Sequence, residues 1–234
     1  MAKTVNIPGR ASVLKAMHSA GSSQQGNKLL VLMVHDFPGS REGNHALFAD
    51  IEALLAEENI HSLRYDARGC GESESGPGGF TLDSACQDFQ SVLNWADQEG
   101  YERFLLIGEG VGATVCLINL SFNVVAQALF WPVLQPPEWV RQGILPPDAG
   151  PEFVRQMQKT DLTGVLQDVV TPTLIMHGVE DKTVPVSQLD HARRHMRSKR
   201  IEITTFHDGE HGLHKLNHRK AVFFHLMQFV EKYI

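Results

Sequence analysis

Short apolar segments that alternate with amphipathic ones constrain the fold of this chain most strongly. Leu29–Val34, Phe104–Ile107 and Thr173–Met176 are predominantly apolar, as expected of strands that are covered on both faces. Apolar residues recur at helical spacing in Phe48–Leu55 and Leu82–Ala96. This alternation predicts an α/β fold, in which a mostly parallel sheet carries helices on both faces.

Further segments complete this pattern. A closing helix is expected over Val222–Val230. An antiparallel edge is expected from Val5–Ile7 and Ser12–Met17, and further strands from His61–Tyr65, Val124–Phe130 and Ile201–Phe206.

A proline-rich stretch interrupts the alternation. Six of the eleven prolines lie between Pro132 and Pro151. We therefore predict a small cap or lid over residues 133–168, inserted between a first core part at 1–132 and a second at 169–234. A length of 234 residues suits one domain with this excursion.

Composition excludes several classes of function. A net charge of −6 argues against a nucleic-acid partner. The longest apolar run is far shorter than the roughly 20 residues that span a bilayer, so no membrane partner is expected. The first residues lack the apolar core of an export signal, and the three cysteines show no Cys-x-x-Cys motif. We therefore expect reduced thiols and a cytoplasmic protein.

Polar and glycine-rich motifs follow the predicted strands. Because ligands of parallel sheets bind at the carboxyl ends of the strands, these motifs should meet in one site. In chain order they are His35-Asp36-Phe37-Pro38-Gly39, Asp66-Ala67-Arg68-Gly69-Cys70-Gly71-Glu72-Ser73, Gly108-Glu109-Gly110-Val111-Gly112, His177-Gly178-Val179-Glu180-Asp181-Lys182-Thr183-Val184-Pro185 and His207-Asp208-Gly209-Glu210-His211-Gly212.

Over nearly the whole chain, this series resembles the α/β-hydrolase family, and within it small bacterial esterases and serine-aminopeptidase-like proteins. The Asp-x-Arg-Gly-x-Gly-x-Ser and His-Gly-x-x-Asp-x-x-Val-Pro motifs carry the resemblance. It implies a catalytic acid at Asp181, a catalytic histidine at His211 and an oxyanion hole from the backbone N–H groups of Phe37 and Val111. The nucleophile position falls on Gly110, where the family has serine.

Glycine at position 110 has no side-chain oxygen or sulfur nucleophile, which excludes a covalent acyl-enzyme there. Two neighbours also depart from the family pattern. Glu109 stands where the family commonly has histidine, and Asp36 stands where the oxyanion turn usually has glycine. A carboxylate that points into this site would oppose stabilisation of an oxyanion, but the sequence does not give the direction of either side chain.

Three functions remain open. The first is a catalytically inactive protein that binds a small ester-like or aromatic ligand, or a protein partner, in the cleft that holds the active site of the family. The second is a weak hydrolase, or a cofactor-free acid–base enzyme that uses His211 and Asp181 without a covalent intermediate. The third is an ordinary serine esterase whose nucleophile was replaced deliberately. The three neighbouring departures from the family pattern, at Asp36, Glu109 and Gly110, favour a natural replacement of the serine. The sequence leaves the oligomeric state open.

Other residues have candidate roles beside structural ones. Trp139, Phe153 and Met157 of the cap could line an apolar pocket or simply pack. Cys70 lies near the site without an evident base, and the family pattern makes Asp66, Arg68 and Ser73 structural. No metal or cofactor is expected, because the spacing of the histidines, among them His191, His195, His211, His214 and His218, completes no metal-ligand pattern.

Overall fold

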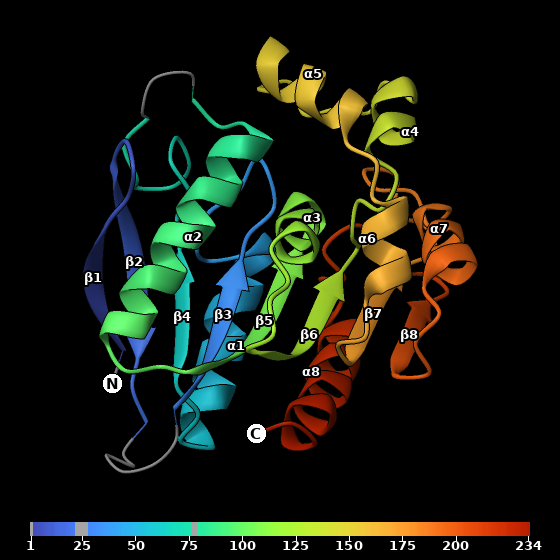
Figure 1. The fold of residues 1–234 in the computed structure, drawn as a ribbon. Coiled ribbons are helices and arrows are strands. Elements are labelled where there is room, and N and C mark those ends of the chain that lie inside the picture. The colour runs from blue at the N-terminus through green and yellow to red at the C-terminus, as the bar shows by residue number, and fades with distance from the viewer. Residues whose placement is uncertain (1, 22–27, 76–78) are drawn as a thin grey trace.

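The sheet is the central element of the fold. The computed structural model describes residues 2–21, 28–75 and 79–234, and among these residues eight strands form one sheet in the order β1-β2-β4-β3-β5-β6-β7-β8 (Figure 1). The strands β3 to β8 run parallel to one another, while β1 and β2 form an antiparallel edge. The strands are β1 (Ala2–Pro8), β2 (Val13–Ser19), β3 (Leu29–Val34), β4 (Ser62–Tyr65), β5 (Arg103–Glu109), β6 (Val124–Phe130), β7 (Thr173–Gly178) and β8 (Ile201–Phe206).

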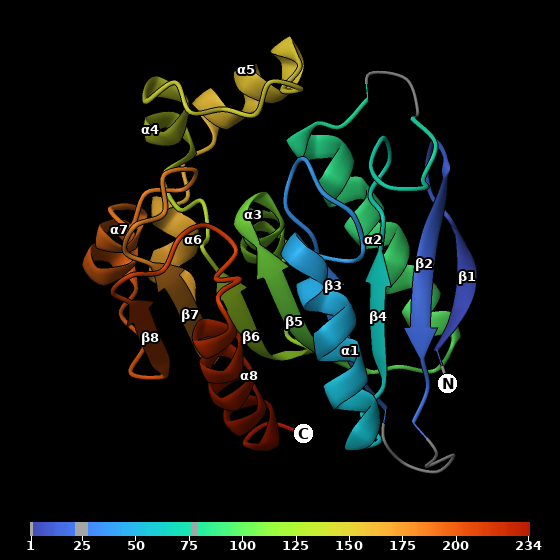
Figure 2. The same ribbon diagram turned by 180° about the vertical axis from the view of Figure 1, so that it is seen from behind.

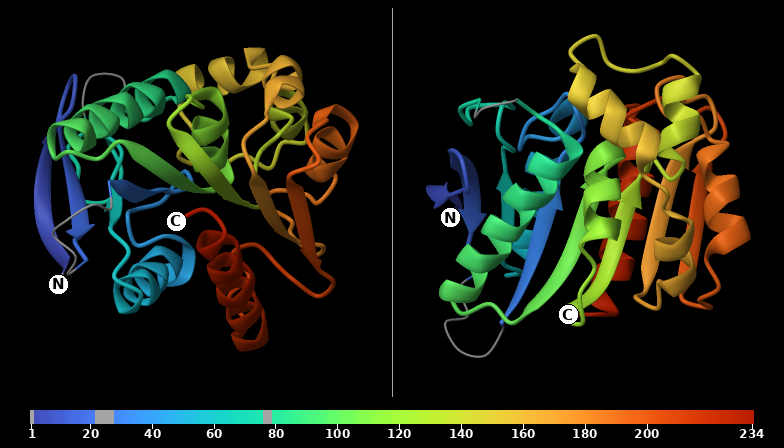
Figure 3. Two further views of the ribbon diagram at one scale, coloured as in Figure 1. Left: turned by 60° about the horizontal axis from the view of Figure 1, so that its bottom comes forward. Right: turned by 45° about the horizontal axis from the view of Figure 1, so that its top comes forward.

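Helices cover both faces of this sheet. One face carries α2, α3 and α6, and the opposite face carries α1 and α8 (Figure 2). The left view of Figure 3 shows the resulting three layers, with the sheet between the two layers of helices. The helices are η1 (Asn44–Ala46), α1 (Leu47–Glu57), α2 (Leu82–Gln98), α3 (Gly110–Ile118), α4 (Pro136–Arg141), α5 (Pro151–Lys159), α6 (Thr163–Asp168), α7 (Gln188–His195) and α8 (Leu216–Glu231). The predicted α/β class is thereby confirmed.

The apolar patterning explains this layering. All six residues of β3 are buried, and alternate residues join the two core clusters on opposite sides of the sheet. The long helix α2 begins with a capping box, in which the Thr81 side chain accepts from the Ser84 N–H and the Ser84 hydroxyl accepts from the Thr81 N–H. In the described part of the chain, no helix combines the length and apolar character needed to cross a membrane.

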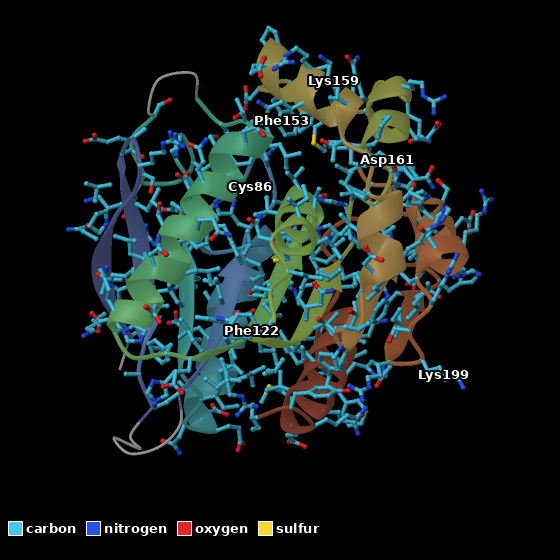
Figure 4. The ribbon with its side chains drawn as sticks, in the orientation of Figure 1. Cys86, Phe122, Phe153, Lys159, Asp161 and Lys199 are labelled. Carbon is cyan, nitrogen blue, oxygen red and sulfur yellow. The ribbon has the colours of Figure 1, made fainter. Side chains whose placement is uncertain are left out.

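Residues 133–168 hold three short helices. The helices α4 and α5 lie beyond the carboxyl ends of the strands, above the rest of the molecule in Figure 1, while α6 lies over the sheet beside α7. Phe153 projects from α5 toward the core and is fully buried (Figure 4). The cap boundaries that the sequence predicts remain a prediction.

Candidate active site

A sharp turn joins β5 to α3 and places Gly110 at the carboxyl edge of the sheet. Gly110 is buried and has φ of +49°, a left-handed conformation that favours glycine. A Cβ atom at this position would lie 2.0–2.2 Å from the carboxyl atoms of Asp36. Gly112, two residues further along the chain, could not carry a Cβ either, because that atom would lie 2.2 Å from the Val34 carbonyl oxygen. The turn is therefore built for glycine at both positions.

The Asp36 carboxyl group occupies the place that the resemblance assigns to the oxyanion. Its Oδ1 atom accepts hydrogen bonds from the backbone N–H of Phe37, at 2.7 Å, and from that of Val111, at 2.8 Å. These are the two donors of the expected oxyanion hole. The Asp36 side chain therefore points into the oxyanion hole. The sequence alone leaves this direction open.

His35 holds the turn that carries Asp36. Its Nε2 atom accepts from the Ala67 N–H at 3.0 Å, so the ring proton lies on Nδ1, which donates to the Asp36 carbonyl oxygen at 2.6 Å. Burial lowers the pKa of His35 and so favours this neutral form. His35 is 3% exposed, and its ring fixes the backbone of residue 36 through the bond to the Asp36 carbonyl oxygen.

Asp181 and His211 lie together beside this carboxyl group. Asp181 Oδ1 accepts from the N–H groups of Thr183 and Val184, both at 2.8 Å, and its Oδ2 accepts from His211 Nδ1 at 2.9 Å. The second ring nitrogen, Nε2, lies 3.6 Å from Asp36 Oδ2. Burial alone lowers the pKa of His211, but the hydrogen bond to Asp181 and the negative charge of Asp36 nearby outweigh it and raise the pKa to about 10. His211 is therefore an imidazolium between two carboxyl groups at neutral pH.

The Glu109 carboxyl group contacts the start of η1. Both of its carboxyl oxygens accept from the Asn44 N–H, at 3.1 and 3.2 Å, and the side chain is buried. The guanidinium of Arg219 donates to the carbonyl oxygens of Asn44 and His45, at 2.8 Å each. Burial raises the pKa of Glu109 to about 8 despite these partners.

This raised pKa predicts a stability effect of Glu109→Gln. The folded chain retains the Glu109 proton between the ordinary value of 4.5 and about 8, so the free energy of unfolding falls as pH rises through that window. Glutamine cannot ionise. From pH ~5 to pH ~8.5 we expect wild type to lose more stability than the variant, by on the order of a few kcal/mol.

Thermal unfolding across this pH range measures the difference. His211 keeps its proton in the folded chain over this range and loses it in the unfolded chain above its ordinary value of 6.5. This further loss of stability occurs in wild type and variant alike, so the comparison isolates Glu109. Parallel melting curves for wild type and Glu109→Gln would contradict the buried, partly protonated carboxyl group.

The Asp-x-Arg-Gly loop is a network of structural contacts. Asp66 accepts from the Arg41 side chain at 2.5 Å, and Arg68 forms a buried ion pair with Asp88 at 2.5 Å. Ser73 donates its hydroxyl proton to the Asp66 carbonyl oxygen. Burial raises the pKa of the Cys70 thiol to about 12, which keeps it protonated and a poor nucleophile.

A cavity of about 430 Å³ lies against the turn that carries Phe37. The rings of Phe37 and Phe80 stack at 4.2 Å, and Phe153 packs against both, at 5.1 and 5.8 Å. The volume of this cavity is within the range of small-ligand sites. The lining residues are Phe37, Pro38, Gly39, Gly69, Cys70, Gly71, Ser75, Gly79, Phe80, Asp148 and Gly150.

The three cap residues singled out in the sequence are all buried. Trp139 donates its indole N–H to the Thr183 carbonyl oxygen at 2.8 Å and so ties α4 to the loop of Asp181. Phe153 and Met157 belong to the apolar core on the same side of the sheet, and Phe153 contacts the ring of Phe37. Their role in ligand binding stays a prediction.

The histidines are dispersed. His191 and His195 are neighbours on α7, His214 packs on His45, and His218 bonds to Asp208 at 2.9 Å. Over residues 2–21, 28–75 and 79–234, no cluster of three or more His, Cys, Asp or Glu side chains is arranged to hold a metal ion.

Asn44 and Arg219 are site neighbours that the sequence did not reveal. Asn44 of η1 donates its N–H to Glu109, and Arg219 of α8 donates to the Asn44 carbonyl oxygen. Only the tertiary fold brings these residues together. No motif surrounds either residue, so no local signal could have identified them.

Comparison with known proteins agrees with this architecture. The sequence model of the prolyl oligopeptidase family matches residues 133–234, which is less than half of the chain. No curated protein matches the sequence. Three solved structures are similar to this chain over nearly its full length, each at low sequence identity.

Est1E from Butyrivibrio proteoclasticus, solved with ferulic acid bound, is 19% identical, with a TM-score of 0.84 over 98% of both chains. The alpha/beta hydrolase domain-containing protein 10 from mouse is 15% identical, with a TM-score of 0.81 over 99% of both chains. The esterase Pf2001 from Pyrococcus furiosus is 17% identical, with a TM-score of 0.80 over 100% of this chain and 91% of that one. The chain has the α/β-hydrolase fold, as the sequence predicts.

Proposed function

We propose that this chain is an α/β-hydrolase-fold protein of the carboxylic-ester hydrolase type that has lost serine-based acyl transfer and keeps a cleft for a small ester-like or aromatic ligand. One observation carries the proposal: Asp36 Oδ1 accepts hydrogen bonds from both N–H groups expected to form the oxyanion hole. With no side chain at Gly110 and a carboxyl oxygen in the hole, a substrate carbonyl has neither a nucleophile nor an oxyanion site.

The fit between Asp36 and Gly110 supports a natural replacement over an engineered one. The carboxyl group of Asp36 occupies the volume in which a Cβ atom of residue 110 would lie. A serine there would have to displace this carboxyl group from the two N–H groups that hold it. The aspartate at position 36 and the glycine at position 110 are therefore complementary, as expected when both residues change together.

The ligand class follows from the cavity beside the turn. Its aromatic wall, with stacked Phe37 and Phe80, favours a flat apolar group. The related fold of Est1E was solved with ferulic acid bound. Because Asp36 already places a carboxyl group in the hole, a neutral ester should bind here better than a free acid. A cytoplasmic location stays a prediction from the sequence.

Two measurements test this proposal. A fluorophosphonate probe should leave wild type unlabelled, because Gly110 at the nucleophile position carries no hydroxyl group; labelling of any residue would overturn the loss of serine chemistry. Methyl ferulate should raise the melting temperature of wild type more than ferulate does. The shift should disappear in Phe80→Ala and persist in Phe122→Ala, whose side chain is fully exposed (Figure 4). Absence of any shift in wild type would overturn the binding part.

A further inference from the structure

An aromatic side chain is exposed at the amino ends of the strands, at the edge of the sheet opposite to Gly110. Phe122 lies in the turn between α3 and β6, and its ring is fully exposed (Figure 4). Exposure of a large aromatic surface to water costs free energy that burial against a partner would recover. The described part of the chain provides no such cover for this ring.

Two hollows flank Phe122, which lines both of them. The first, of about 610 Å³, extends over the starts of β6 and β7 to Arg200, just before β8. The second, of about 490 Å³, extends over the end of α2 and the start of β5. Ile118 and Val170 are exposed in the first hollow, so three of the eight large apolar side chains exposed in the described residues gather here. Such a gathering marks an interaction surface.

The first hollow ends at a basic segment, and we call it the basic hollow. Five of the 21 Lys and Arg residues lie within positions 193–200, which contain no Asp or Glu. Arg200, the last of them, lines the hollow, and Lys199 beside it is exposed (Figure 4). Among the described residues, neither side chain has an ion-pair partner. Asp168 also lines this hollow, but the cations outnumber it, so this side of Phe122 is positive.

The second hollow carries carboxylates, and we call it the acidic hollow. Asp97, in the last turn of α2, lines it, and so does Glu102, just before β5. Glu102 is paired with Lys28, whereas no residue in the described ranges forms an ion pair with Asp97. Glu99, directly after α2, is exposed as well. This side of Phe122 is therefore negative.

We propose that this surface joins two copies of the chain, related by a two-fold axis that passes beside Phe122. The strand order places Phe122 between the charged sides, because it precedes β6, which lies between β5 on the acidic side and β7 and β8 on the basic side. A two-fold axis sets each side of such a surface against the opposite side of the same surface in the second copy. The basic hollow of each copy then faces the acidic hollow of the other, and the two Phe122 rings cover each other at the centre.

The opposite charges of the two hollows favour a second copy over another occupant. A small anion bound at Arg200 would leave the Phe122 ring and the acidic hollow uncovered, and an acidic protein would be repelled by Asp97. A second copy complements both charged sides and covers the ring in one contact. Each chain has a net charge of −6, but repulsion between exposed charges that lie more than about 10 Å apart is largely screened by salt.

The contact between copies leaves the candidate active site free. Helix α3 begins at Gly110, at the carboxyl edge of the sheet, and ends at Ile118, beside the basic hollow. The cavity of Phe37 and Phe80 shares no lining residue with either hollow. The dimer is therefore independent of the proposed function, and Phe122→Ala should lose the dimer while it still binds methyl ferulate.

Sedimentation velocity of the full chain tests the proposal. Wild type should sediment as a dimer at micromolar concentration, and added salt should weaken the dimer because the contact includes opposite charges. Phe122→Ala should raise the dissociation constant at least about tenfold, the effect of losing a central aromatic contact. Phe224→Ala removes another exposed phenyl ring, on α8, and should leave the dissociation constant unchanged.

Charge reversal tests the pairing across the axis. Asp97→Lys and Arg200→Glu should each raise the dissociation constant about tenfold, because each sets like charges against one another. The chain that carries both reversals should regain the dissociation constant of wild type, since the facing charges are again opposite. Under mild oxidation, Phe122→Cys should form a disulfide-linked dimer and Phe224→Cys should not, because only the first position lies beside the axis.

Three results would overturn the proposal. They are a wild type that is monomeric at micromolar concentration, a dimer that Phe122→Ala leaves intact, and a double reversal that dimerises no better than the single reversals. Circular dichroism of each variant establishes that it is folded. All three results leave the methyl ferulate and fluorophosphonate tests unaffected, so a failure here is distinct from a failure of the proposed function.

Discussion

A chain that carries both Asp36→Gly and Gly110→Ser is expected to hydrolyse activated esters at least about 10³-fold faster than wild type. The serine supplies the missing oxygen nucleophile, and the glycine frees the N–H groups of Phe37 and Val111 for a substrate oxyanion. Asp181 and His211 are already bonded at 2.9 Å. Release of p-nitrophenol from p-nitrophenyl butyrate measures the gain in kcat/KM. A fluorophosphonate probe should label the double variant at residue 110 only.

The single variants separate the two contributions. In Gly110→Ser alone, the new Cβ would lie 2.0–2.2 Å from the Asp36 carboxyl atoms, so that group must turn aside while its charge stays near the site. We expect this variant to remain about 10²-fold less active than the double variant, the effect of one lost oxyanion donor or more. Adding His211→Ala to the double variant should abolish the gain. Equal activity of the single and double variants would contradict an oxyanion hole filled by Asp36.

Replacement of Asp88 by alanine is expected to produce the largest loss of stability, about 3–5 kcal/mol. Asp88 is fully buried and accepts hydrogen bonds from the Arg68 backbone N–H, Nε and Nη2, at 2.5–3.2 Å. Its removal leaves the Arg68 guanidinium buried without a counter-charge. Urea unfolding measures the change in the free energy of unfolding.

Glu202→Ala provides the matched control for an exposed ion pair. Glu202 pairs with Lys232 at 2.9 Å, but both side chains are about half exposed, and we expect a change below about 1 kcal/mol. A similar small loss for Asp88→Ala would mean that the Arg68–Asp88 pair does not hold the loop that joins β4 to α2. The structural reading of the Asp-x-Arg-Gly motif would then be wrong.

The fold could be predicted because burial on both faces leaves a strong mark in the sequence. Leu29–Val34 is apolar at every position, and all six residues lie in the interior as β3. The motifs that follow the strands could be placed at one edge, since parallel strands end on the same side of a sheet. That topology brings Asp181 and His211 into contact although thirty residues separate them.

The chemistry of residue 36 could not be predicted in the same way. Whether its carboxyl group points inward depends on a hydrogen bond from the Val111 N–H, seventy-five positions away in the chain. It also depends on the space that Gly110 leaves because it has no Cβ atom. The direction of Glu109 depends likewise on the Asn44 N–H. Side-chain directions of this kind are decided by tertiary contacts, for which no local pattern of residue types exists.

A crystal structure of the wild-type chain at neutral pH tests the central claim most directly. We expect Asp36 Oδ1 to lie within hydrogen-bond distance of both the Phe37 and the Val111 nitrogen atoms, at close to 2.7 and 2.8 Å, with Oδ2 facing His211 Nε2. An Asp36 side chain turned to solvent, with water molecules bonded to both N–H groups, would contradict it.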